Sequence, residues 1–202
     1  MNNALLFSLK QKIKMYIQNR YLPRLYDKLI RRTEVIPGRI IMADMHSRTI
    51  PFSMKVMYSY LKKKGHDPLV YMIDMESAGP LRTFLYMRSF MKEYAAAEYI
   101  FICSYFLPVS SCRKRPETKV VQLWHSGGLL KKMGLDTRDD IPDGYKGNVT
   151  ANYDVVTVSA PVCEAVWESA WGLPKGTACA TGLSRTDIYS SDSWNRRSRE
   201  LF

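Results

Sequence analysis

The residues best suited to chemistry form one short segment, His125-Ser126-Gly127-Gly128, which follows the apolar run 120–124. That run is predicted to be a buried strand, so the histidine is expected where the strand leaves its sheet. An imidazole beside the backbone N–H groups of glycines suits a general base that acts on a hydroxyl next to an anion. Lys131 and Lys132 add positive charge for a phosphate. A histidine that only caps the following helix fits the spacing equally well, and this alternative stays open.

Other catalytic motifs are absent or incomplete. Ser126 lacks the preceding glycine of a nucleophile elbow, because Trp124 occupies that position. The sequence holds no G-x-G-x-x-G and no P-loop motif, which leaves dinucleotide binding and P-loop chemistry unsupported. Four cysteines without C-x-x-C spacing and three unpaired histidines give no metal-ligand pattern. We therefore expect no metal, no cofactor, and reduced, mostly buried cysteines.

The elements that must position these residues alternate between short apolar runs and helical patterns. Near-continuous apolar strands separated by helices indicate a parallel sheet that is covered on both faces. We expect an α/β fold, a Rossmann-like doubly wound parallel sheet. Ligands of such sheets bind at the carboxyl ends of the strands, which draws attention to the loops 44–49, 125–128 and 182–187. The predicted strands are 39–43, 69–73, 99–102, 120–124, 155–158 and 178–181, and the predicted helices are 52–64, 80–94 and 161–171.

The positive charge is concentrated at the start of the chain. Residues 1–32 hold eight basic residues and one acidic residue, so +7 of the net +11 lies there. Apolar residues recur at helical spacing in this arm, and Pro23 is expected to divide it into two helical pieces near residues 21–23. A basic amphipathic helix suits the anionic surface of a membrane. The residues expected to contact that surface are Lys10, Lys12, Lys14, Arg20, Arg24 and Lys28.

The sequence of the arm has two alternatives to membrane binding. Its apolar stripe could simply dock on the domain while its lysines face water. Nucleic-acid binding is not expected, because no recognised nucleic-acid motif accompanies the charge. No run of apolar residues approaches the length of a membrane span.

Three segments resemble motifs of the CDP-glycerol glycerophosphotransferase family. Residues 121–134 (VQLWHSGGLLKKMG) resemble its Q-x-W-H-G motif, which is followed by a short Gly/Ala segment and K-K-x-G. Residues 153–159 (YDVVTVS) are similar to its Y-D-x-V-x-V-S strand, and residues 182–187 (GLSRTD) to its G-x-P-R-x-D. Ser126 and Ser184 stand where the family has Gly and Pro. The resemblance spans about residues 38–190.

The resemblance implies a GT-B type transferase of two Rossmann domains, peripheral to the cytoplasmic side of the cell membrane and active in teichoic-acid synthesis for the cell wall. Such enzymes move glycerol phosphate from CDP-glycerol, or from a related CDP-polyol, to a hydroxyl of a lipid-linked acceptor and release CMP. By position, His125 would be the general base that deprotonates this hydroxyl. Contacts with substrate are expected from Ser126, Gly127, Gly128, Lys131, Lys132, Arg185 and Asp187.

The expected organisation has three parts. Residues 1–36 form the basic, membrane-surface arm, residues 37–190 the Rossmann-like acceptor-side domain, and residues 191–202 the truncated start of an interdomain helix. The family's second Rossmann domain, which holds most of the CDP-glycerol site, does not fit within 202 residues. The chain is therefore expected to be the acceptor-side half of a two-domain glycerophosphotransferase. The alternative is a non-catalytic membrane-associated binding module or an inactive fragment of such a transferase.

Overall fold

A six-stranded parallel sheet forms the centre of the computed structural model, which describes residues 3–75, 77–126, 128–137 and 144–201. The strand order is β2-β1-β3-β4-β5-β6, and all neighbouring strands are parallel. The chain adds β2 on one side of β1 and all later strands on the other side. This is the doubly wound, Rossmann-like arrangement that the apolar runs predict. The strands are β1 (Ile40–Asp44), β2 (Leu69–Met72), β3 (Tyr99–Ile102), β4 (Lys119–Gln122), β5 (Val155–Thr157) and β6 (Ala178–Cys179).

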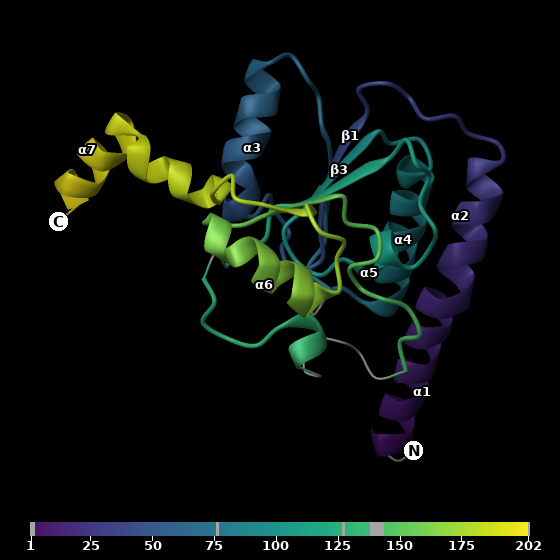
Figure 1. Ribbon diagram of the computed structural model, residues 1–202. Coiled ribbons are helices and arrows are strands. Elements are labelled where there is room, and N and C mark those ends of the chain that lie inside the picture. The colour runs from purple at the N-terminus through teal and green to yellow at the C-terminus, as the bar shows by residue number, and fades with distance from the viewer. Residues whose placement is uncertain (1–2, 76, 127, 138–143, 202) are drawn as a thin grey trace.

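Helices cover both faces of the sheet (Figure 1). Successive residues of β1 point to opposite faces, so Ile41 joins the larger core while Met42 joins the smaller one. The larger core is closed by α2 (Leu22–Ile30), α4 (Pro80–Tyr94), α5 (Leu107–Ser110) and α6 (Pro161–Trp171). The smaller core is closed by α3 (Phe52–Lys63).

The arm is one continuous helical rod along the edge of the molecule (Figure 1). Helix α1 (Asn3–Tyr16) passes through a π-helical turn, η1 (Ile17–Tyr21), into α2. The interruption lies where it was predicted, but the chain stays helical. Pro23 has no N–H to donate to the preceding turn, and a wider turn absorbs that loss without a break.

Half of the arm is part of the core. Leu22 and Tyr26 are fully buried, so the apolar side of α2 docks on the domain, as the docking alternative requires. Leu9, Ile13 and Tyr16 of the preceding segment are exposed. Docking on the domain therefore describes α2, while the exposed apolar side chains that membrane binding requires lie on α1.

The remaining elements are short or terminal. The helix expected near residues 191–202 is α7 (Asp192–Leu201), which projects from the body (Figure 1). The sequence does not predict the short helices α5, η2 (Gly134–Asp136) and η3 (Ser184–Ser190), because segments of three to seven residues carry too little periodic pattern. The division at residues 36 and 190 stays a prediction.

Two further observations concern the whole described chain. None of the helices described combines the length and the apolar character needed to cross a membrane. The four cysteines are unpaired; Cys103, Cys112 and Cys163 are buried and Cys179 is half-buried.

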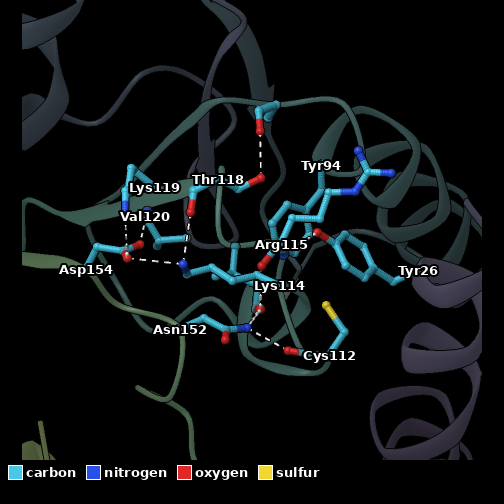
Figure 2. A network of polar contacts seen from close by, with 12 residues as sticks. Tyr26, Tyr94, Cys112, Lys114, Arg115, Thr118, Lys119, Val120, Asn152 and Asp154 are labelled. Carbon is cyan, nitrogen blue, oxygen red and sulfur yellow. Dashed lines mark hydrogen bonds and ion pairs between the residues drawn. The ribbon is translucent and has the colours of Figure 1, made fainter. Parts of the chain in front are cut away.

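Asp154 ties the amino ends of β4 and β5 together (Figure 2). The Val120 N–H donates to Asp154 Oδ2 at 2.7 Å, and Lys114 Nζ donates to Oδ1 at 3.1 Å. Lys119 Nζ adds a second positive charge 3.7 Å from Oδ1. The side chains of Lys114 and Asp154 are only 13% and 22% exposed, so solvent screens this pair weakly. This aspartate of the YDVVTVS segment therefore has a structural role.

The same region attaches the arm to the sheet. Arg115 Nη2 donates to the carbonyl oxygens of Ile30 and Thr33, which satisfies the carboxyl end of α2 with a positive charge. The backbone N–H of Arg115 donates to the Tyr26 hydroxyl at 3.2 Å (Figure 2). Burial raises the pKa of Tyr26 to about 12, which keeps this hydroxyl neutral. Asn152 Nδ2 joins the neighbouring loop by donating to two backbone carbonyls, at 2.7 and 2.6 Å.

We expect Asp154→Asn to lower the free energy of unfolding by about 2 kcal/mol, because the substitution leaves Lys114 half-desolvated without its charged partner. Urea denaturation followed by far-UV circular dichroism measures the change. The matched control is Asp67→Asn, which breaks the 2.7 Å pair between Lys62 and an aspartate that is 88% exposed. An exposed pair contributes little, so this control should show no measurable change. Equal losses in the two variants would contradict the structural role of Asp154.

Candidate active site

The chain turns sharply between β4 and His125. Trp124 has a φ of +51° and is the one non-glycine residue in a left-handed conformation in the part of the chain described. This conformation costs an L-residue about 1–2 kcal/mol, so its surroundings must hold it in place. The turn ends β4 at Gln122, two residues earlier than the apolar run predicts, and brings His125 beside the end of β3.

The buried side chain of Gln122 holds the turn. Its Oε1 accepts a hydrogen bond from the Trp124 N–H at 3.0 Å. Its Nε2 donates to the Ser104 carbonyl at 2.9 Å and to the Tyr153 hydroxyl at 3.2 Å. One amide therefore connects the ends of β3, β4 and β5, with every polar atom of its side chain in use.

The Trp124 indole fills an aromatic cage. It is 4% exposed and meets three rings nearly edge-on, an arrangement that aromatic pairs prefer. These rings belong to Tyr105, Trp167 and Trp171, with centroid distances of 5.1, 5.9 and 4.9 Å. The imidazole of His125 stacks on the indole at 4.3 Å. The sequence alone predicts no role for Gln122 or Trp124, although both belong to the Q-x-W-H segment that carries the family resemblance.

The tautomer of His125 follows from one hydrogen bond. Its Nδ1 lies 2.9 Å from the carbonyl oxygen of Cys103. A carbonyl only accepts, so Nδ1 carries the proton and Nε2 of the neutral ring keeps a lone pair. The side chain is exposed at the carboxyl edge of the sheet. In this tautomer the exposed imidazole can accept a proton at that edge.

A buried carboxylate fixes the segment that holds the histidine. Asp44, at the end of β1, is 2% exposed and accepts hydrogen bonds from Ser104 Oγ at 2.6 Å and from the His46 N–H at 2.8 Å. Cys103 Sγ lies 3.7 Å from its Oδ1. Burial, followed by the charge of Asp44, raises the pKa of the Cys103 thiol, which stays protonated and donates. The sequence indicates a ligand-binding loop at 44–49, but it gives no sign of this role of Asp44, because the apolar run marks Asp44 only as the residue that follows a strand.

Arg185 brings the last loop to the histidine. Its Nη1 donates to the backbone carbonyl of His125, and its guanidinium lies 5.8 Å from the centre of the Phe52 ring. Ser184 Oγ donates to the Ser53 carbonyl, which docks η3 on the start of α3. Of the three predicted loops, the structure thus brings 125–128 and 182–187 into direct contact.

The other predicted substrate residues are placed less centrally. Ser126 and Gly128 are half-buried, and Ser126 replaces the family's glycine without a left-handed backbone. Asp187 is exposed on η3, and Gly127 lies outside the described residues. Lys131 and Lys132 line an open groove of about 340 Å³ along α6, whose lining includes neither His125 nor Arg185. The two lysines therefore form a second cluster, separate from the histidine.

The position of Gly134 explains why the K-K-x-G segment ends in a glycine. It has a φ of +57°, and a Cβ there would collide with the Ala170 carbonyl oxygen and the Trp171 ring. This glycine lets η2 lie directly on α6. In the described part of the chain, no three His, Cys, Asp or Glu side chains gather closely enough to hold a metal ion.

The predicted membrane residues are mostly accessible. Lys12, Arg20, Arg24 and Lys28 are exposed and Lys14 is half-buried, while the side chain of Lys10 lies outside the described residues. Residues 24–32 include a shallow hollow of about 320 Å³ lined by four basic side chains and Asp27.

Residues 25–201 match the family model described as CDP-Glycerol:Poly(glycerophosphate) glycerophosphotransferase. The chain belongs to this family. It is 31% identical over 105 residues to the teichoic acid glycerol-phosphate primase of Bacillus subtilis strain 168, which covers 48% of this chain and 27% of that protein. It is 24% identical over 163 residues to the teichoic acid ribitol-phosphate primase of Bacillus spizizenii strain W23, which covers 75% of this chain and 41% of that protein.

Solved structures of the wall teichoic acid polymerase TagF share the fold. The unmodified TagF structure superposes with a TM-score of 0.66 at 14% identity, over 95% of this chain and 51% of TagF. A TagF variant soaked with CDPG gives 0.67 at 16% identity, over 98% and 52%. This family member therefore has the fold of one half of a GT-B type polymerase. It spans about half of the solved chains and less than half of the curated relatives named above.

We expect Gln122→Leu to lower the free energy of unfolding by about 2 kcal/mol, because it leaves the Trp124 N–H and the Ser104 carbonyl buried without partners. Urea denaturation measures the loss, and near-UV circular dichroism reports the released indole. Tyr153→Phe is the matched control: it removes one 3.2 Å hydrogen bond from the same amide and should cost about 1 kcal/mol or less. If the control were as damaging as Gln122→Leu, Gln122 would not be what holds the Trp124 turn.

Proposed function

We propose that this chain is the acceptor-side half of a transferase that moves glycerol phosphate, or a related polyol phosphate, from its CDP derivative to a hydroxyl of a lipid-linked teichoic-acid acceptor. Membership of the family supports the class of reaction. The relatives include a glycerol-phosphate primase and a ribitol-phosphate primase, and a TagF variant was soaked with CDPG, which supports a CDP-polyol donor.

The observation that carries the proposal is the 2.9 Å contact between His125 Nδ1 and the Cys103 carbonyl oxygen, which sets the tautomer of the ring. Because Nδ1–H donates to the Cys103 carbonyl, Nε2 is free to accept the proton of the acceptor hydroxyl. The hydroxyl oxygen then attacks the phosphorus of the glycerol phosphate, and the bond from this phosphorus to the CMP oxygen breaks. CMP leaves with the bonding electron pair, and the proton stays on His125.

The rest of the edge positions the base and offers positive charge. Trp124 and Asp44 fix the imidazole and the Cys103 segment, so little reorganisation is needed at the moment of transfer. Arg185 stands beside the histidine with a fork of donors suited to a phosphate. Phosphoryl transfer depends on this kind of positioning and charge neutralisation.

We further propose that the protein works on the cytoplasmic side of the cell membrane as a peripheral protein. The exposed basic residues of the arm support this location, because each Lys or Arg near an anionic surface contributes about 1 kcal/mol of attraction. An enzyme held at the membrane meets a lipid-linked acceptor at a raised effective concentration.

The transfer is tested by release of CMP from CDP-glycerol in the presence of a lipid-linked acceptor. We expect little or no release from the 202-residue chain alone, and robust release from the longest natural protein that contains it. In that protein, His125→Asn should lower kcat by about 100-fold or more, the usual contribution of a general base. His66→Asn, which changes an exposed histidine next to Gly65, is the matched control and should leave kcat unchanged.

Two results would overturn parts of this proposal. Robust release from the 202-residue chain that disappears in His125→Ala would show that one Rossmann domain suffices. Absence of release from the longer protein, with intact binding of the acceptor, would favour the non-catalytic binding module.

The arm is tested by sedimentation with vesicles that contain phosphatidylglycerol. Deleting residues 1–32 would remove the buried Leu22 and Tyr26, so substitution is the better design. Replacing four exposed arm residues by Gln should weaken binding at least tenfold, and added salt should weaken binding of the unmodified chain. These four are Lys12, Arg20, Arg24 and Lys28.

The control for the arm carries the same change of charge elsewhere. It replaces the exposed residues Lys63, Lys92, Lys146 and Lys175 by Gln and should weaken binding much less. Equal weakening in the two variants would show that net charge, and not the arm, attracts the vesicles.

A further inference from the structure

An apolar groove of about 470 Å³ lies between the arm and α4. Ile13 and Ile17 of the arm form one wall, Phe84 and Met87 of α4 form the other, and Ala78 lies on the lining just before α4. The volume falls within the roughly 300–1,000 Å³ of ligand pockets. We propose that this groove binds an acyl chain of phosphatidylglycerol, with the lipid phosphate at Lys14.

Charge complementarity selects an anionic occupant. Lys14 is half-buried on the lining of the groove, so its ammonium group lies where an apolar chain would meet a polar head. The arm that carries it holds +7 of the net charge of the chain. A long lysine stem can follow apolar surface while its charge stays at the rim.

Gln18 supplies a second, independent observation. It lines the groove one turn after Lys14, is 1% exposed, and its Nε2 points to Met87 Sδ at 3.6 Å. Its Oε1 is buried and accepts no hydrogen bond from the residues described. A buried acceptor without a donor is costly, and a glycerol hydroxyl of the lipid head group would supply the donor.

The walls of the groove are built to meet a lipid surface. The π-helical turn η1 begins at Ile17, and such turns recur at functional sites. Leu9 and Ile13 of the arm are 53% and 52% exposed, and Leu81 and Leu85 of α4 are 72% and 52% exposed. Both helices that border the groove therefore present apolar side chains to solvent, as a membrane-contacting surface does.

The inference rests on the proposed membrane association but not on the transfer reaction. The experiment incubates the 202-residue chain with vesicles of phosphatidylglycerol that carry a photoreactive group on the acyl chain. After irradiation, tandem mass spectrometry maps the labelled residues. We expect labels on Ile17 and Phe84 themselves, and no competition from excess sn-glycerol 3-phosphate, which lacks a chain.

Two matched variants separate the groove from general contact with lipid. Ile13→Glu places a carboxylate on the lining of the groove, while Leu9→Glu makes the same change one turn earlier on the same helix, outside the lining. Ile13→Glu should reduce labelling of Phe84 at least fivefold, and Leu9→Glu less than twofold. Ala78→Phe, which fills the groove without changing charge, should also reduce it at least fivefold. Circular dichroism confirms that each variant is folded.

Other outcomes would overturn the inference. Labels confined to the exposed Leu9, Tyr16, Leu81 and Leu85 would show that the helices only rest on the lipid. Equal losses in Ile13→Glu and Leu9→Glu would show the same. Release of CMP by the longer protein is measured separately, so a failure of the groove and a failure of the transferase proposal are distinguishable.

Discussion

The arrangement of the carboxyl edge of the sheet depends on one unfavourable backbone conformation. Trp124 is held in the left-handed region, where an L-residue loses about 1–2 kcal/mol. The Gln122 amide and the aromatic cage stabilise it from opposite sides, one through the backbone N–H and the other through the indole. Without this turn, β4 would continue in register with β3, and the imidazole would lie along the strand rather than beside the Cys103 carbonyl.

The family motifs therefore combine residues with a structural role and residues whose polar groups meet at the carboxyl edge of the sheet. Gln122, Gly134 and Asp154 belong to the segments that carry the resemblance, yet each is explained by packing or by hydrogen bonds to backbone. His125 and Arg185 are the motif residues whose polar groups meet at the carboxyl edge of the sheet. Asp154 binds the amino end of β4 and Gln122 lies at its carboxyl end, so side chains fix both ends of β4.

The strands and main helices of this fold can be predicted from the sequence, but the contacts that shape the candidate site cannot. Apolar runs located all six strands, and helical spacing located α3, α4 and α6 to within a few residues. The left-handed Trp124 and the buried Asp44 escaped because each depends on partners far away in sequence, which no local pattern reveals. The separation of Lys131 from His125 escaped for the same reason, since it follows from the close contact of Gly134 with α6.

The hydrogen bond from Arg185 to the His125 carbonyl has a mechanical consequence. Arg185 lies on η3, which leads directly into α7, and Trp194 of α7 comes within 6.5 Å of the same Phe52 ring that Arg185 covers. Both helical segments thus lean on the same Phe52 ring, beside the backbone of the histidine. The backbone at His125 and the C-terminal helix are therefore joined by one short chain of contacts that runs through Arg185, Phe52 and Trp194.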